Sequence, residues 1–103
     1  MGAETFFTKA KGKTAQDAFQ TATSAALHNY GHAGYTGTIA EKQGFVMIAL
    51  PAGDEPRQFA SDLIDKRDRR IDDKWGPAGC IDCGPDPADT QRRVFLFFGW
   101  ASS

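Results

Sequence analysis

Apolar residues fall into short segments along the chain, separated by runs rich in glycine, proline and charge. Residues 4–11 combine phenylalanine with threonine and lysine, which predicts a first strand near a sheet edge. From Thr14 onward, alanines and Phe19 recur at helical spacing and predict a helix with a narrow apolar face. Thr14 followed by Asp17 is typical of a helix start, and Gly31 is typical of a helix end.

The next apolar segments predict a hairpin. Residues 36–40 and 45–50 can pair around a turn at 41–44, with Gly44 at a position that needs positive φ. The run at 45–50 is apolar without interruption, which is expected of a central, buried strand.

A second helix is predicted to begin near Gly53 or Asp54 and to end at Gly76–Pro77. Its apolar side is formed by Phe59, Ala60, Leu63, Ile64, Ile71 and Trp75. A short strand at 79–82 and a strongly apolar strand at 93–101 complete the chain. The resulting order, β-α-β-β-α-β-β, favours an α+β fold with a mainly antiparallel sheet and two helices packed on one face.

Composition narrows the classes of protein. With 103 residues the chain is expected to form a single domain over 1–103. The formal net charge of −1 gives no basic field, so a nucleic acid polymer is not the expected partner. No secretory signal and no apolar run of about 20 residues is visible, so we expect no membrane contact and a cytoplasmic location in the host cell.

The most informative segment is the glycine-rich connection at 30–42. It is not a phosphate loop of the Walker type, and it closes a helix rather than opening one, so the helix dipole there disfavours anions. Cationic side chains would have to overcome that bias. The glycines permit close backbone approach, hydroxyls can donate hydrogen bonds and a tyrosine can stack. Its candidate ligand-binding residues are His32, Tyr35, Thr36, Gly37, Thr38 and Lys42.

The second predicted helix supplies three further candidates. Helical spacing places Arg67 inside the apolar stripe, where a guanidinium needs a carboxylate or a bound anion. Lys74 lies near the same side, and Trp75 at the helix end can cover the core or face a ligand. If both helices end at the same end of the sheet, the loops at 31–38 and 76–83 become neighbours and can share a pocket.

A zinc site is an alternative interpretation. His28 and His32 form H-x3-H, while Cys80 and Cys83 form C-x-x-C, and together they make a Cys2His2 set. The order and the gap differ from those of a zinc finger, and a core of this size needs no metal. The leading interpretation therefore includes no metal and no cofactor, with both cysteines as thiols in a reducing compartment.

Catalysis is the least supported class. No nucleophile-elbow or zinc-protease motif is present, and no serine, histidine and aspartate set can be placed together. His32 with Asp72 or Asp73 could form a base and its orienting group, but nothing fixes a nucleophile.

Three segments carry a resemblance. Residues 30–42, 72–80 and 96–102 are similar to a family of small uncharacterised proteins associated with bacteriophage genomes, although Cys83 does not belong to the family pattern. The resemblance implies no activity and no binding residues. It does imply a context in which small phage proteins sequester a host factor or a signalling molecule.

The leading hypothesis is a non-catalytic module that binds a small anionic, nucleotide-like ligand between the loops at 31–42 and 74–80. In it, Arg67, Lys42 and Lys74 balance charge, while Tyr35 or Trp75 stacks. The alternative is a protein-interaction module or obligate homo-oligomer that binds a host protein, because phenylalanine is abundant for this length. The third hypothesis is a fold supported by zinc.

Overall fold

The computed structural model describes residues 3–30 and 38–102. They form four strands, two α-helices and one 3-10 turn. In chain order these are β1 (Ala3–Gly12), α1 (Ala15–Tyr30), η1 (Ile39–Glu41), β2 (Phe45–Met47), α2 (Pro56–Asp65), β3 (Ala78–Asp86) and β4 (Asp89–Ser102).

The strands form a single sheet in the order β1-β4-β3-β2. β4 is antiparallel to both β1 and β3, while β2 and β3 are parallel. The predicted α+β class with a mainly antiparallel sheet is therefore confirmed, as are the strands at 4–11 and 93–101. β1 lies at an edge, as its lysines indicated.

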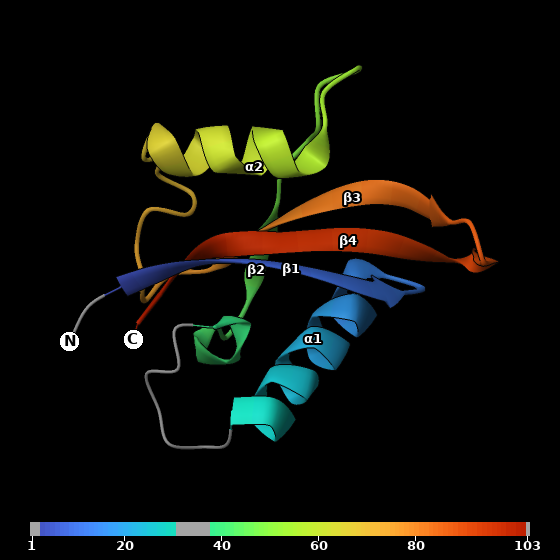
Figure 1. Cartoon of the computed structure of the whole chain (residues 1–103), viewed down its shortest axis with the longest axis horizontal. Coiled ribbons are helices and arrows are strands. Elements are labelled where there is room, and N and C mark those ends of the chain that lie inside the picture. Colours follow the sequence, from blue (N-terminus) through green and yellow to red (C-terminus); the bar gives the residue numbers. More distant parts are fainter. Residues whose placement is uncertain (1–2, 31–37, 103) are drawn as a thin grey trace.

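The two helices cover opposite faces of the sheet, so the predicted packing of both on one face is wrong (Figure 1). Neighbouring residues of β4 show the separation: Phe95 and Phe97 belong to the core under α1, whereas Leu96 and Phe98 belong to the core under α2. Successive side chains of a strand point to opposite faces. Apolar residues at both parities, as in β4, therefore require a cover on each face.

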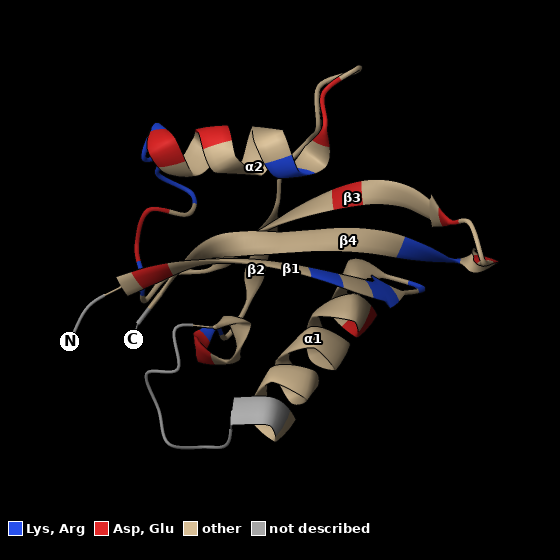
Figure 2. Ribbon diagram, in the orientation of Figure 1, with Lys and Arg blue, Asp and Glu red and all other residues tan. Residues whose placement is uncertain are grey.

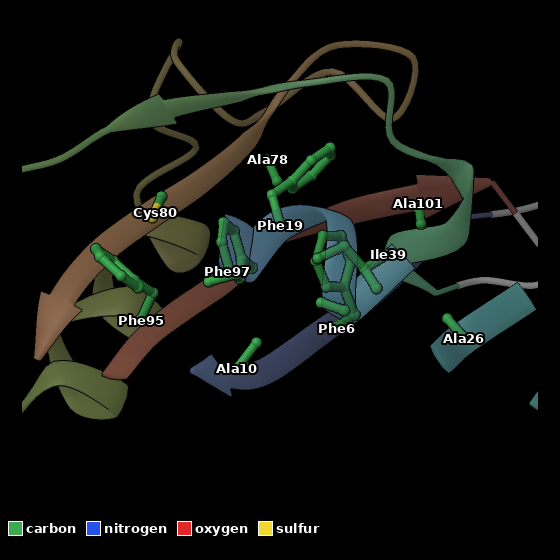
Figure 3. Close-up of a cluster of buried hydrophobic side chains, with 12 residues drawn as sticks. Phe6, Ala10, Phe19, Ala26, Ile39, Ala78, Cys80, Phe95, Phe97 and Ala101 are labelled. Carbon is green, nitrogen blue, oxygen red and sulfur yellow. The ribbon is translucent and has the colours of Figure 1, made fainter. Parts of the chain in front are cut away.

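The core on the α1 face is built around three aromatic rings. Phe19 of α1 lies with its ring centroid 5.2 Å from that of Phe45 and 5.5 Å from that of Phe97. The helix begins as predicted, because the Asp17 amide donates a hydrogen bond of 3.2 Å to the Thr14 hydroxyl. Alanines allow α1 to approach the sheet closely, and the wider cluster is drawn in Figure 3.

α2 is much shorter than predicted. It begins after Glu55, whose carboxylate accepts a hydrogen bond of 2.7 Å from the Gln58 amide, and it ends at Asp65 rather than at Gly76. The ending is a Schellman motif: Arg67 has φ 54°, its amide donates to the Ile64 carbonyl, and the next amide donates to the Leu63 carbonyl. Arginine occupies a position that usually holds glycine, which is why the sequence gives no stop signal.

The predicted hairpin of residues 36–40 with 45–50 is also wrong. Residues 39–41 form η1, and β2 pairs in parallel with the start of β3 at the second edge of the sheet. Gly44 does not have positive φ. The observed order is β-α-β-α-β-β, with α2 as the crossover that a parallel pair requires.

β3 extends the predicted strand at 79–82 in both directions and turns tightly into β4. Asp86 is buried at this turn, where its carboxylate accepts a 3.0 Å hydrogen bond from the Ala88 amide and lies 3.2 Å from the Lys11 ammonium. These contacts hold the pKa of Asp86 below its usual range, and the hydrogen bond from Ala88 contributes most. Asp86 therefore ties the β3–β4 turn to the end of β1.

Candidate functional site

The glycine-rich segment can be followed only at its C-terminal end. The predicted ligand residues His32, Tyr35, Thr36 and Gly37 lie outside the described residues. Thr38 caps η1, because its hydroxyl accepts a hydrogen bond of 3.2 Å from the Ala40 amide. This contact gives the Thr38 side chain a local structural role.

Lys42, one of the predicted ligand residues, is bound by the protein itself. Its side chain is buried, and the ammonium donates to three carbonyl oxygens, of Asp73 at 3.3 Å, Lys74 at 3.2 Å and Gly76 at 2.9 Å. Burial lowers the pKa of Lys42, while the nearby Asp73 carboxylate acts in the opposite direction. An ammonium group has three donors, so this one is fully used by the protein.

Residues 38–42 and 73–76 are thus in contact, as predicted for the two loops. Trp75 is 63% exposed, and the Lys74 ammonium lies 5.2 Å from the centroid of its ring. The prediction that Trp75 continues the apolar stripe of α2 is wrong, because the helix ends ten residues earlier.

Arg67 does not lie inside the apolar stripe, contrary to the sequence prediction. Its left-handed backbone turns the chain away from α2, and its side chain is 74% exposed, with the guanidinium 3.6 Å from the Asp72 carboxylate. Leu63 and Ile64 form the buried side of the helix instead. Arg67 reaches a different cavity, on the α2 face of the sheet.

That cavity, the α2-face pocket, has a volume of about 350 Å³ and lies between α2 and the paired strands β1 and β4. Its apolar wall is made by Phe7, Ile64 and Trp100. Its polar lining consists of Thr5, Ser61, Asp65 and Arg67. The Arg57 guanidinium lies 4.3 Å from the centroid of the Phe7 ring and so adds positive charge beside this wall.

Trp100 supplies the most unusual group in this lining. Its indole Nε1 is buried and has no hydrogen-bond partner within the described part of the chain. A buried donor without an acceptor costs about 1–3 kcal/mol. A hydrogen-bond acceptor from a bound molecule at Nε1 would remove that cost.

The pocket combines more donors than acceptors. Arg67 and the Trp100 indole can only donate, the hydroxyls of Thr5 and Ser61 can do either, and Asp65 is the one carboxylate in the lining. Such a set suits a molecule with an anionic group and separate hydrogen-bond donors. Of its residues, only Arg67 is among the ligand-binding residues predicted from the sequence. Trp100 was predicted only as part of an apolar strand, because the sequence does not indicate that its indole N–H is buried without an acceptor.

The two cysteines do not form a joint site. Cys80 belongs to the core on the α1 face, whereas Cys83 packs against the core on the α2 face. Burial raises the pKa of Cys80 to about 12 and is also the main cause of the raised pKa of Cys83. Among the described residues, which exclude His32, no group of three metal-ligating side chains occurs. The zinc hypothesis therefore lacks a usable cysteine pair.

Comparisons with protein-family models, with curated proteins and with solved structures gave no match. Within the described residues, neither helix is long and apolar enough to cross a bilayer.

Proposed function

We propose that this protein is a non-catalytic binding module for a small anionic, nucleotide-like ligand, and that the ligand occupies the α2-face pocket. The observation that carries the proposal is the buried indole N–H of Trp100, which has no acceptor in the described chain, on a residue that lines the same cavity as Arg67. This replaces the expected location between the loops at 31–42 and 74–80, where Lys42 is already used by backbone carbonyls.

The roles follow from the chemistry of the lining. Arg67 would pair with the anionic group, since a guanidinium presents donors in a geometry that suits carboxylates and phosphates. Asp65 would accept from an N–H or hydroxyl of the ligand. Phe7 and Ile64 offer apolar surface to a planar ring. A ligand with both a phosphate and a base or sugar meets all three requirements.

The left-handed backbone of Arg67 adds support. A non-glycine residue in this conformation costs about 1–2 kcal/mol, and such strain is concentrated at functional sites. Glycine at this position would relieve the strain but would remove the guanidinium. Arginine at this strained position is therefore consistent with a use for its side chain.

The test is a thermal-shift and calorimetric screen with phosphate, pyrophosphate, mononucleotides and cyclic nucleotides. A specific ligand at 100 times its Kd should add about 2.7 kcal/mol to the free energy of unfolding. Trp100→Phe, which keeps the ring but loses the N–H, and Arg67→Gln should each weaken binding about tenfold or more.

Arg69→Gln is the matched control, because Arg69 is exposed in the same segment and does not line the pocket. Absence of binding by every compound in the screen would reject the proposed ligand class. Binding that is unchanged in both pocket variants would reject the proposed site. If the resemblance to phage-associated proteins holds, the biological role would be sequestration of such a ligand.

A protein-interaction module remains the second candidate. Met47 and Trp75 are the large apolar side chains that are exposed among residues 3–30 and 38–102, at 52% and 63%. Both lie toward the β2 edge, since Met47 is in β2 and Trp75 precedes the start of β3. Light scattering separates a homo-oligomer from a monomer. Substitution of Trp75 by serine should then disrupt any assembly that depends on this surface.

A further inference from the structure

β1 presents a long open edge. It is an end strand of the sheet, paired only with β4, and no other strand of the described chain lies on its outer side. At ten residues it is longer than β2, which forms the other edge with three. The unpaired N–H and C=O groups of an edge strand are a template for another extended chain.

A groove follows this edge. The cavity has a volume of about 600 Å³ and is lined by seven consecutive residues of β1, at positions 4–10. Consecutive strand residues point alternately to the two faces of a sheet. A cavity that contacts all of them must therefore run along the backbone edge, which is where a further strand would hydrogen-bond.

The opposite wall belongs to α1 and to the start of η1. It is formed by Thr21, Ala22, Ala25, Ala26, Thr38 and Ile39. Alanines on the helix leave room for the side chains of a chain seated against β1. The groove thus offers backbone pairing on one side and a shallow, mainly apolar wall on the other.

The charged residues that line the cavity adjoining one end of the groove are mainly cationic. Thr21 also lines this cavity of about 480 Å³, whose other residues include Lys11, Lys13 and Arg92, with Asp17 as the single acid. Figure 2 shows the cationic residues gathered at this end of β1 and β4. Lys11 is paired with Asp86, and Arg92 lies 3.9 Å from Asp89. Within the described residues Lys13 has no carboxylate partner.

We infer that the β1 edge, with the groove beside it, binds an extended peptide segment of another protein as a fifth strand of the sheet. Backbone hydrogen bonds to β1 would supply the affinity, and alternate small apolar side chains would face α1. Charge complementarity fixes the orientation: the acidic end of the peptide lies beside Lys13, because the Lys11 ammonium is already paired with Asp86. A second copy of this chain fits less well, because its β1 contributes only Glu4 as an acidic residue.

The test begins with a selection from a random library of ten-residue peptides, using the whole protein as bait. Enriched peptides are then synthesised with a fluorophore and titrated by fluorescence anisotropy. We expect sequences with small apolar residues at alternate positions and acids at one end. Binding should fall about tenfold in Lys13→Glu and should be abolished when alternate peptide nitrogens are methylated.

Two substitutions on α1 separate the groove from the rest of the helix. Ala25→Leu fills the groove at an exposed position and should weaken binding, whereas Ser24→Leu, on the same helix outside the groove lining, should not. Lys66→Glu is the charge control for Lys13→Glu. Hydrogen exchange of β1 amides should slow on addition of peptide, and exchange of α2 amides should not change.

Three results would overturn the inference. One is the absence of peptides enriched over an unrelated bait. Another is binding that is unaffected by Lys13→Glu, Ala25→Leu and N-methylation together. The third is a dimer in sedimentation whose β1 amides are already protected without peptide, which would assign the edge to a second copy.

Discussion

The ammonium nitrogen of Lys42 lies 2.9 Å from the carbonyl oxygen of Gly76 and joins two loops that are 34 positions apart in sequence. The carbonyls of Asp73 and Lys74 complete its set of acceptors. An exposed ammonium group at this position could bind an anionic ligand. In this protein the Lys42 ammonium instead joins two segments of the backbone. It holds the connection between α2 and β3 against the end of η1.

Lys42→Met should lower the free energy of unfolding by about 2–4 kcal/mol. Methionine keeps the buried aliphatic volume, but it removes the hydrogen bonds to three carbonyl oxygens, of which that of Asp73 still accepts from the Gly76 amide. Urea denaturation followed by fluorescence measures the change. Lys66→Met, at an exposed position, is the control and should alter stability by less than about 0.5 kcal/mol. Equal effects of the two variants would show that the hydrogen bonds of Lys42 contribute nothing.

Arg67→Gly should raise the free energy of unfolding by roughly 0.5–1 kcal/mol. Glycine removes a left-handed strain of about 1–2 kcal/mol but makes the unfolded chain more flexible, which costs about 0.4–1 kcal/mol. The exposed ion pair with Asp72 adds little to this sum. Arg67→Ala keeps the strained Cβ and should show no gain. If Arg67 also binds the ligand, the stabilised glycine variant should bind it less tightly.

Gly79→Ala should destabilise the protein by about 1–3 kcal/mol through overpacking. A Cβ at this position would lie 2.6 Å from Cζ of Phe98 and 3.0 Å from Cγ2 of Ile71, both of which are fully buried. Gly44→Ala is a matched control, since a Cβ at Gly44 meets no atom within 4 Å. In thermal denaturation, Gly79→Ala should therefore have a clearly lower melting temperature than Gly44→Ala. Similar melting temperatures would contradict the described packing around Phe98.

Cys80 and Cys83 should remain separate thiols under oxidation. Three steps along a strand span about 10 Å, beyond the roughly 7 Å that a disulfide permits between Cα atoms. Burial also raises the pKa of Cys80 to about 12, so its thiolate is scarce at neutral pH. Mass spectrometry after diamide treatment of the folded protein should show no loss of two hydrogens. Native alkylation should modify Cys83 before Cys80, and the reverse order would count against the assigned burial.

The contribution of Asp68 to stability should disappear in acid. Its carboxylate accepts hydrogen bonds from the side chain and the backbone of Arg70, which lower its pKa to about 2. Because the folded-state pKa lies below the ordinary value of 3.8, this contribution is present above about pH 4 and is lost as the pH falls toward 2. The difference in stability between Asp68→Asn and the parent should be below about 1 kcal/mol at pH 7 and should fall steeply between pH 4 and pH 2. A difference that stays the same between pH 4 and pH 2 would exclude the ionised form as its source.

The sequence predicted those elements that are determined by residues close together in the chain, such as a helix cap or an apolar face. Thr14 begins α1 because its hydroxyl can cap the helix, and Phe19 is buried because it lies on the apolar side of an alanine-rich helix. The apolar strand at 93–101 was equally clear. Its uninterrupted apolar run also indicates a second covered face, because Leu96 and Phe98 are as apolar as Phe95 and Phe97.

The failures have non-local causes. Arg67 ends α2 without glycine or proline, so the helical pattern could be extended to Trp75 by mistake. Residues 45–50 appeared central because they are apolar, but an edge strand of a sheet covered on both faces is apolar too. The α2-face pocket could not be predicted, since Thr5, Ser61 and Trp100 meet only after β1 pairs with β4 and α2 packs over them.

The pairing of β1 with β4 has a consequence for synthesis. Ala3 pairs with Ser102, and Phe7 pairs with Phe98. β1 therefore cannot pair with its partner strand until β4 has been synthesised. At about 5–20 residues per second, a ribosome would leave both edges of β1 unpaired for roughly five to twenty seconds. A nascent segment that contains Phe6 and Phe7 is prone to aggregate during that time. Lys9 and Lys11 directly after it are charged gatekeepers of the kind that limit such contacts.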